Sequence, residues 1–349
     1  MTHVSTIFPV EDLEKEIDAG NVRFQSHPSE PLWIYNYTES VQYNRYWNDV
    51  TLNCRGLILD AEMNIIARPW KKFFNFGERP LEFNTNDPVE VTDKKDGSLG
   101  ILYKSPITGS YAIATRGSFM SDQAIHATKV FNDKYSHIVD PIKGYTYLFE
   151  IVYPENRIVL DYGSLDDLII LGAVHNERGW YSGPNEATAL LNWPGPETEV
   201  FPYQSLNECF GVHRVNAEGL VIRAGNRQVK MKQADYVALH KIVTGLNERR
   251  VWELMKEGQT VEQICEVLPD EFHQWVKEVH DDLTEQFRVI YHGTFNEYID
   301  IKNILNGDMV RKHFAQYAVK TKYPSILFNY LDNRSVSDTI WDLIKPEFK

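Results

Sequence analysis

The chain has 349 residues, 43% of them hydrophobic and 24% charged, which is typical of a globular protein long enough for two domains. Its net charge of −13 argues against binding nucleic acid through overall charge, but it is compatible with a local basic groove. We expect no membrane partner, because the sequence shows no signal peptide and no membrane-spanning stretch. Its three cysteines lack a metal or redox spacing and indicate a reducing, cytoplasmic location.

Strand patterns dominate the first two thirds of the chain. Branched and aromatic residues predict strands at 32–37, 55–60 and 65–68, and a proline keeps the basic segment 68–76 out of the centre of a sheet. Further strands are predicted at 99–104, 111–115, 145–152, 168–174, 218–223 and 228–232. Helices are predicted at 11–19, 121–135 and 187–191.

The pattern changes near residue 236, after which apolar residues recur at intervals of three and four, as in helices. We place a domain boundary within 240–246, which divides the chain into residues 1–243 and 244–349. The expected fold class is α+β: a domain of antiparallel sheets with flanking helices, followed by an all-α C-terminal domain.

One short stretch, Lys-Lys-Asp-Gly-Ser at 94–98, lies between two predicted strands. In this pattern Lys94 is suited to act as a nucleophilic amine, Asp96 to orient that amine or a metal ion, and Gly97 to let the backbone approach a bulky ligand. A charged turn capped by Asp-Gly is the alternative interpretation. The residues downstream decide between the two.

Four features follow in the chain: Arg-Gly-Ser at 116–118, a strand reading Phe-Glu that carries Glu150, Glu218 followed by glycine, and Lys-x-Lys at 230–232. Residues two apart on a strand face the same side, so the last two lysines point into one cleft. They repel each other unless an anion lies between them, and a triphosphate suits that place. One glutamate suits a ribose hydroxyl and the other a divalent metal ion.

The order of these features resembles that of the covalent nucleotidyltransferases, which include polynucleotide ligases and capping guanylyltransferases. Local strings are similar to the phage-type RNA ligases that join single-stranded ends (the RNA ligase 1 family of T-even phages). The strings are 35–37, 54–56, 72–75, 94–99, 156–160, 218–219 and 230–240. The resemblance implies a nucleotidyltransferase (ATP-grasp-like) first domain and, if a phage encodes the chain, the host cytoplasm as its location.

The resemblance implies catalytic roles for four residues. Lys94 would attack the α-phosphorus of ATP to give lysyl-AMP, and Glu218 would associate with Mg²⁺ or Mn²⁺. Lys230 and Lys232 would hold the α-phosphate as pyrophosphate leaves. An ordinary lysine is a poor nucleophile at neutral pH, because its pKa is about 10.4. We expect burial, the neighbouring lysines (Lys95 among them) and a bound metal to lower the pKa of Lys94.

The resemblance also implies how ATP is bound. Glu150 would bind the ribose and Val221 would pack on the adenine, while Arg55 and Lys72 would clamp the outer phosphates. Tyr35 stands where the family contacts ATP, although a buried tyrosine is an equally good interpretation.

Substrate contacts are expected from three further residues. Arg116 and Ser118 stand at a family position that usually carries lysine, and would meet the RNA 5′-phosphate. Tyr236 matches an aromatic residue implicated in joining, with a core tyrosine at the start of a helix as the alternative. A second metal ligand is expected at Asp96.

The basic and aromatic segment 311–323 contains no acidic residue. It suits single-stranded RNA through stacking and phosphate pairing. The alternative is an amphipathic helix that packs Phe314 and Tyr317 inward.

The expected function is an ATP-dependent RNA ligase that joins 5′-phosphate and 3′-hydroxyl ends of single-stranded or nicked-loop RNA, such as tRNA, as a monomer. The C-terminal domain is a candidate RNA-specificity module. The alternatives are a DNA ligase, a capping guanylyltransferase, and an RNA-binding protein that kept the fold without catalysis. The first two carry a β-barrel after the Lys-x-Lys strand, where this chain is expected to turn helical.

Overall fold

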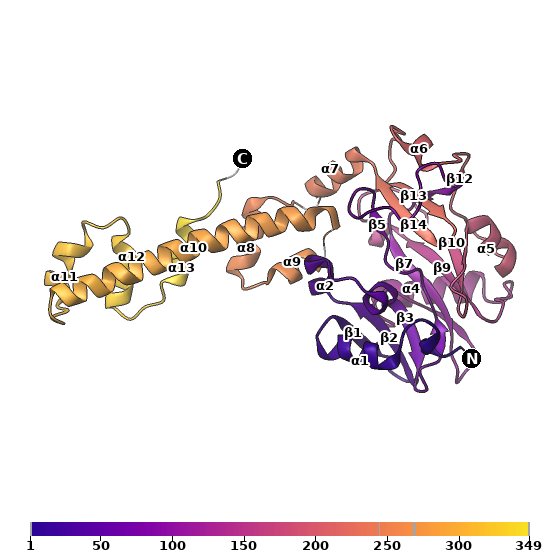
Figure 1. Ribbon diagram of the computed structural model, residues 1–349, viewed down its shortest axis with the longest axis horizontal. Coiled ribbons are helices and arrows are strands. Elements are labelled where there is room, and N and C mark those ends of the chain that lie inside the picture. The colour runs from indigo at the N-terminus through magenta and orange to yellow at the C-terminus, as the bar shows by residue number, and fades with distance from the viewer. Residues whose placement is uncertain (1, 244, 267, 269, 348–349) are drawn as a thin grey trace. The chain divides into compact units, whose positions relative to one another are not determined.

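The structure is a computed structural model that describes residues 2–243, 245–266, 268 and 270–347. Its contacts divide the chain into two compact units, Met1–Thr244 and Gly245–Lys349. Figure 1 shows that sheets make up most of the first unit and helices the second. None of the described helices is long and apolar enough to cross a membrane.

The first sheet is antiparallel, in the order β1-β2-β3-β4. Its strands are β1 (Val22–Ser26), β2 (Leu32–Tyr37), β3 (Arg55–Asp60) and β4 (Ile65–Ala67). The helices beside it are η1 (Val4–Thr6), α1 (Val10–Asp18), α2 (Glu39–Asn44) and α3 (Asp49–Asn53). Buried Leu13 of α1 and Val50 of α3 pack on Leu57 of β3, so these helices cover one face of the sheet.

The second sheet has the order β11-β10-β9-β7-β8 and buries both of its faces. Its strands are β7 (Ser98–Lys104), β8 (Tyr111–Ala114), β9 (Tyr145–Val152), β10 (Asp167–His175) and β11 (Tyr181–Ser182). Leu148 packs with Ile34 and Ile58 of the first sheet. Phe149, its neighbour on β9, packs with Phe131 on the opposite face, under helices α4 (Asp122–Lys134) and α5 (Pro184–Leu191).

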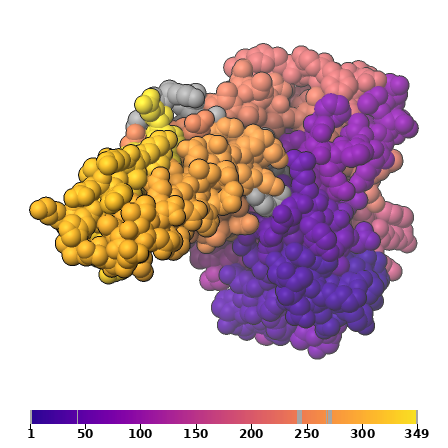
Figure 2. Space-filling view, turned by 60° about the vertical axis from the view of Figure 1, so that its left-hand side comes forward, coloured from indigo at the N-terminus to yellow at the C-terminus, as the bar shows by residue number. Residues whose placement is uncertain are grey.

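The third sheet has the order β12-β6-β13-β14-β5. Its strands are β5 (Phe74–Asn75), β6 (Glu90–Lys94), β12 (Val200–Phe201), β13 (Gly219–Ala224) and β14 (Arg227–Lys232). Val91, Leu206 and Ile222 lie in the core beneath it, which includes the short helix α6 (Leu206–Cys209). The 3-10 turn η2 (Pro154–Asn156) and helix α7 (Ala234–Val243) complete the first unit. Figure 2 shows segments far apart in the chain, coloured indigo, purple and salmon, adjoining on its surface.

All the secondary-structure elements in the described residues of the second unit are helices. Its helices are α8 (Glu248–Lys256), α9 (Val261–Glu266), α10 (Asp270–Ile304), α11 (Arg311–Ala318), α12 (Pro324–Leu331) and α13 (Ser337–Leu343). The 35-residue α10 is the spine of the unit, about 52 Å long at 1.5 Å per residue. Leu283 of α10 packs against Trp252 of α8 and Ile344 after α13.

The expected fold class is confirmed, since sheets with flanking helices precede a helical region. One strand pair departs from the antiparallel expectation: β14 runs parallel to the two-residue β5. The helix expected in the basic segment is α11, and Phe314 is buried in it as the helical alternative predicts. Tyr317, by contrast, is 36% exposed, so its expected inward packing is wrong.

Candidate functional site

Three charged side chains meet where β6, β13 and β14 lie side by side. Lys94 is the last residue of β6, Lys232 is the last residue of β14, and Glu218 directly precedes β13. Lys94 Nζ lies 2.6 Å from Glu218 Oε1, and Lys232 Nζ lies 3.3 Å from the same oxygen. Glu218 is only 3% exposed, so both cations compensate a buried carboxylate. The motifs predicted to act together are therefore in contact.

Gly219 makes this meeting possible. It is the cross-strand partner of both Lys94 and Lys232, and so stands between the two lysines. A Cβ at this position would lie 2.0 Å from the carbonyl oxygen of Met231 on β14. Any side chain here would push β13 and β14 apart, which explains why a glycine follows Glu218.

The electrostatics of Lys94 correct one expectation from the sequence. Desolvation acts to lower the pKa of Lys94, but the carboxylates of Glu218, Glu150 and Asp96 outweigh it and leave the pKa raised. Lys95 was expected to depress this pKa as a neighbouring cation, but its Nζ lies 2.6 Å from Asp93. In the free chain the carboxylates therefore govern the lysine, and its amine is held protonated.

Glu150 approaches from β9 of the second sheet, where its cross-strand partner is Leu99. Burial raises the pKa of Glu150 to about 8, against the opposing effect of Lys94. Gly97 permits the approach, since a Cβ there would lie 2.6 Å from the carbonyl oxygen of Ile151. The glycine predicted to admit a ligand thus admits the backbone of β9.

Asp96 has a structural task that its expected metal role did not include. Its Oδ2 accepts hydrogen bonds from the backbone N–H groups of Val159 and Leu160, at 2.9 and 2.8 Å. Its Oδ1 accepts one from the hydroxyl of Tyr236, at 2.8 Å. Asp96 is 4% exposed, so this carboxylate ties the Lys94 turn to two other segments. These three hydrogen bonds engage both oxygens of Asp96, which leaves Glu218 as the better metal ligand.

Tyr236 itself lies near the start of α7 and is 4% exposed. Lys232 Nζ lies 5.5 Å from the centroid of its ring, which places the side chain between Asp96 and the Lys-x-Lys strand. The alternative of a core tyrosine at a helix start describes its burial, and its hydroxyl still reaches the Lys94 turn.

Lys72 lies within an aromatic cage. Its Nζ is 5.6 Å from the ring centroids of Tyr37 and Trp47, and 5.5 Å from that of Phe74. Arg116 contacts the same cage: its Nη1 donates to the hydroxyl of Tyr37 at 3.3 Å, and its guanidinium carbon lies 5.4 Å from the centroid of that ring. Tyr37 of the cage therefore contacts both Lys72, predicted to bind the outer phosphates, and Arg116, predicted to contact the RNA.

The remaining predicted residues lie as follows. Val221 and Lys230 are direct partners across β13 and β14. Arg55 begins β3, where its charge lowers the pKa of Glu150 while burial raises it. Ser118 accepts the backbone N–H of Met120 and so closes its own turn.

For Tyr35 the structure favours the buried alternative. It is 8% exposed and packs in the core of the first sheet with Leu57 and Val50, on the side covered by α1 and α3. Burial raises the pKa of Tyr35 to about 12. The tyrosine that reaches the predicted phosphate clamp is Tyr37, two residues further along β2.

A comparison with known proteins identifies the family. Residues 53–242, more than half of the 349-residue chain, match the family described as RNA ligase. The chain belongs to the RNA ligase family. The predicted resemblance and the predicted enzyme class are thereby confirmed.

The proteins similar to this RNA ligase cover different shares of its length. The RNA ligase of Rhodothermus phage RM378 is 22% identical over 380 residues, which cover 86% of this chain and 85% of the phage protein. Among solved structures, an archaeal ATP-dependent RNA ligase is 12% identical with a TM-score of 0.44, covering 71% of this chain and 65% of that one. A Naegleria gruberi RNA ligase with ATP and Mn is 18% identical with a TM-score of 0.34, covering 45% and 52%.

Several residues around the site of this RNA ligase were not predicted as site residues from the sequence. Tyr37 and Trp47 complete the lysine cage, and Arg214 and Gln233 hold the backbone at Glu218. An aromatic residue near a basic one is the only signal that points to the cage. Arg214 belongs to no motif, and its distance from Lys94 in the chain hides the contact.

Among the described residues, no group of three or more histidine, cysteine, aspartate or glutamate side chains is placed to hold a metal ion. One buried carboxylate, Glu218, faces the lysines, and this donor set fits a metal held by one carboxylate together with substrate phosphates.

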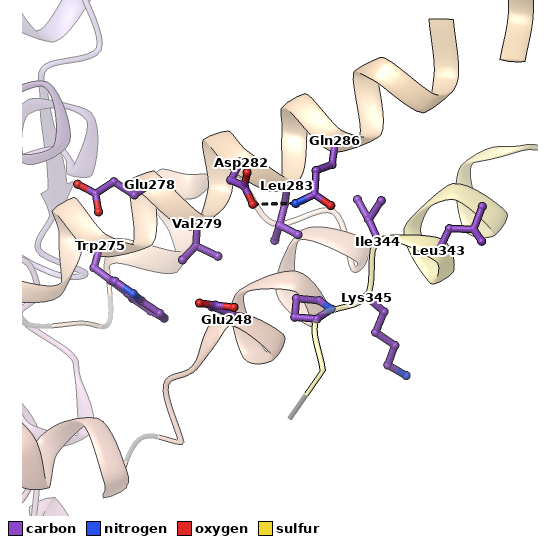
Figure 3. A pocket seen from close by; sticks show the side chains of 11 residues that line it. Glu248, Trp275, Glu278, Val279, Asp282, Leu283, Gln286, Leu343, Ile344 and Lys345 are labelled. Carbon is purple, nitrogen blue, oxygen red and sulfur yellow. Dashed lines mark hydrogen bonds between the residues drawn. The ribbon is translucent and has the colours of Figure 1, made fainter. Parts of the chain in front are cut away.

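The second unit of this RNA ligase contains a groove of about 510 Å³ between α8, α10 and the segment after α13. Figure 3 shows Glu248, Glu278 and Asp282 around it, with Trp275 at one end and Lys345 at the other. Three carboxylates against one lysine disfavour RNA phosphates there. The groove therefore does not resemble the lysine-rich site of the first unit.

Proposed function

We propose that this protein uses ATP to join 5′-phosphate and 3′-hydroxyl ends of single-stranded RNA, through a lysyl-AMP intermediate at Lys94. The observation that carries the proposal is the pairing of Lys94 and Lys232 with one oxygen of buried Glu218. Two lysines held that close suit an anion that carries several charges. Membership in the RNA ligase family supports an RNA substrate.

In the first step, Lys94 Nζ forms a bond to the α-phosphorus of ATP, and the bond from that phosphorus to the pyrophosphate oxygen breaks. The amine must lose a proton to attack, and Glu218 Oε1, 2.6 Å away, is within reach to accept it. Lys232 and Lys230 stabilise the charge that develops as pyrophosphate leaves. ATP also supplies negative charge that competes with Glu218 for both lysines.

The neighbouring residues bind the nucleotide. Glu150 binds the ribose, Val221 packs on the adenine, and Arg55 and caged Lys72 bind the outer phosphates. At neutral pH the raised pKa of Glu150, caused by burial, favours its protonated carboxyl, which donates a hydrogen bond. A divalent ion, Mg²⁺ or Mn²⁺, neutralises phosphate charge when bound, and Glu218 is the residue that would hold it.

Two further phosphoryl transfers complete the reaction. The RNA 5′-phosphate takes AMP from Lys94, so a phosphorus–nitrogen bond breaks and a 5′-5′ pyrophosphate bond forms. The RNA 3′-oxygen then bonds to the 5′-phosphorus and AMP leaves. Arg116, beside the Lys72 cage, would contact the 5′-phosphate, and Tyr236 would act in joining by holding Asp96. Ser118 assists through its turn.

The decisive test is incubation with ATP labelled at the α-phosphate and Mg²⁺, followed by denaturing electrophoresis. The wild-type chain should retain label, and Lys94→Ala should not. Lys129→Ala, whose side chain is 75% exposed on α4, is the matched control and should label like the wild type. Label that survives Lys94→Ala would refute the proposal.

The substrate is tested separately. A 5′-phosphorylated single-stranded RNA should be circularised or adenylylated, and a tRNA nicked in a loop should be resealed. Label from GTP in place of ATP would indicate capping, and sealing of nicked DNA alone would indicate a DNA ligase. RNA binding without any label would indicate a protein that kept the fold without catalysis. We further propose that the protein acts as a monomer in the cytoplasm.

A further inference from the structure

The face of the third sheet opposite the lysine site carries a buried charge that the proposed reaction does not use. Along β6 burial alternates, so Asp93 is 8% exposed and shares the buried face with Val91. Its cross-strand partner is Leu220, which belongs to the core beneath the sheet. A carboxylate in that place needs charged partners, because burial alone would disfavour its ionised form.

Asp93 has two such partners. Lys95 Nζ lies 2.6 Å from Oδ2, and Arg214 Nη1 donates to Oδ1 at 2.5 Å. The residues immediately before and after Lys94 are therefore tied to each other and to Arg214. This contact fixes how the backbone turns at Lys94, since both of its neighbours are held on the core face.

Arg214 also holds the other half of the site. The same Nη1 donates to the carbonyl oxygen of Gly219 at 3.2 Å, and the guanidinium carbon lies 4.5 Å from the ring centroid of Phe201. Gln233 completes the support: its backbone N–H donates to the carbonyl oxygen of Glu218 at 2.8 Å. Its side-chain oxygen accepts the backbone N–H of Arg214 at 3.1 Å.

We propose that Arg214 is a positioning residue that holds the Lys94 backbone and the Glu218–Gly219 backbone in one register, and so sets the nucleophile for adenylylation. The inference rests on the proposed function. Arg214 touches neither Lys94 Nζ nor the Glu218 carboxylate in any contact described above, and it acts through the two backbones that carry them.

The same two strands offer a matched ion pair for comparison. Arg223 Nη2 lies 2.9 Å from Glu90 Oε1, and these residues are direct partners on β13 and β6. The side chain of Arg223 is 17% exposed and that of Arg214 is 22% exposed. Glu90 lies four positions from Lys94 on β6, and Arg223 lies four positions from Gly219 on β13, about 13 Å along the strands. Loss of Arg223 thus reports what an ordinary cross-strand ion pair contributes here.

The experiment measures single-turnover labelling from ATP in wild type, Arg214→Met, Arg214→Lys and Arg223→Met. Arg214→Met should lower the maximal labelling rate at least about tenfold, because small displacements of a nucleophile are costly. Its KM for ATP should change less than about threefold, since Arg214 is not placed to contact ATP. Arg214→Lys keeps a positive charge beside the Asp93 carboxylate and should recover part of the labelling rate. Arg223→Met should label within about twofold of the wild type.

A second readout separates positioning from general damage. Sealing of RNA that already carries a 5′-AMP does not require attack by Lys94, so Arg214→Met should lose less of this activity than of labelling. Wild-type labelling in Arg214→Met would overturn the inference. So would equal losses in Arg214→Met and Arg223→Met, or equal losses of labelling and sealing. A wild-type chain that takes no label would instead refute the proposed function, before any variant is compared.

Discussion

The two units of this RNA ligase place their charged side chains very differently. In the first unit, Glu218 is buried and binds lysines from two different strands. In the second, ion pairs such as Arg288–Glu285 join residues one helical turn apart, and the Glu285 side chain is 55% exposed. Exposed pairs of this kind contribute little to stability, whereas a buried carboxylate that loses one partner is costly.

A single substitution should therefore affect a different property in each unit. In the first unit, changing one charged or supporting residue should alter chemistry, because the strands hold reacting groups directly. In the second unit, exposed ion pairs such as Arg288–Glu285 contribute little, and the stability of the unit depends on packing along α10. The following predictions test that contrast.

The largest effect is expected for Gly219→Ala. The new Cβ would meet the Met231 carbonyl oxygen at 2.0 Å, separate β13 from β14, and move Lys232 away from Glu218. Labelling from ATP should fall by at least about a hundredfold. The control is Gly293→Ala, at an exposed position of α10 where a Cβ meets nothing within 4 Å. Equal labelling by the two variants would break the contrast between units.

Trp252→Ala should act on stability in the second unit. Trp252 is 4% exposed, packs with Leu283 and Ile344, and donates to the carbonyl oxygen of Trp341 at 2.9 Å. Its loss should cost roughly 3–5 kcal/mol of unfolding free energy, as for other buried aromatic side chains. Urea unfolding followed by circular dichroism measures this cost. Labelling at 20 °C should be unchanged, and a parallel loss of label would contradict the contrast.

A smaller effect is expected for Trp47→Leu, which removes one wall of the Lys72 cage. The lysine should be held less firmly, so the KM for ATP should rise roughly 2- to 10-fold, the range expected for one cation–π contact. Trp180→Leu is the control, because Trp180 is 56% exposed and also lies under an arginine, Arg178. The two variants are compared by labelling at graded ATP concentrations. An unchanged KM in Trp47→Leu would remove the cage from the site.

A further prediction is a dependence of stability on pH to which the buried Glu150 carboxyl should contribute. Burial raises the pKa of Glu150 to about 8, so between pH 5 and 8 the folded chain binds a proton that the unfolded chain releases. Stability from this group is therefore present at low pH and lost as the pH rises through 8. Glu150→Gln should flatten the fall in urea midpoint between pH 5.5 and 8.5. Identical slopes in variant and wild type would exclude this linkage.

Local patterns predicted much of the fold. Branched and aromatic residues predicted β9 and β10 as strands, and the apolar spacing of three and four after residue 236 predicted the helices that include α10. The Lys94, Glu218 and Lys232 motifs are brought into contact as predicted, because strand pairing aligns them at Gly219.

Contacts between segments far apart in the chain could not be predicted from sequence patterns. Strand alternation would put Tyr35 and Tyr37 on one face of β2, but the pairing register with β3 shifts between Tyr35 and Asn36, which no sequence pattern reveals. The sequence therefore left Tyr35 open between an ATP contact and a buried position. The hydrogen bonds that Asp96 accepts come from the backbone N–H groups of Val159 and Leu160, which no side-chain motif reveals. Arg214 stands in an irregular segment whose course is fixed only by packing against Phe201 and Gln233.

Gly219 has a consequence for how the distance between the two site lysines is set. Neighbouring strands are spaced by about 4.8 Å, so the Lys94 and Lys232 backbones lie on either side of Gly219, about 10 Å apart. That separation is a multiple of the strand spacing and does not depend on any side-chain rotamer. The sheet thus sets the distance between the two lysine backbones, and the strand between them carries a residue without a side chain at this point.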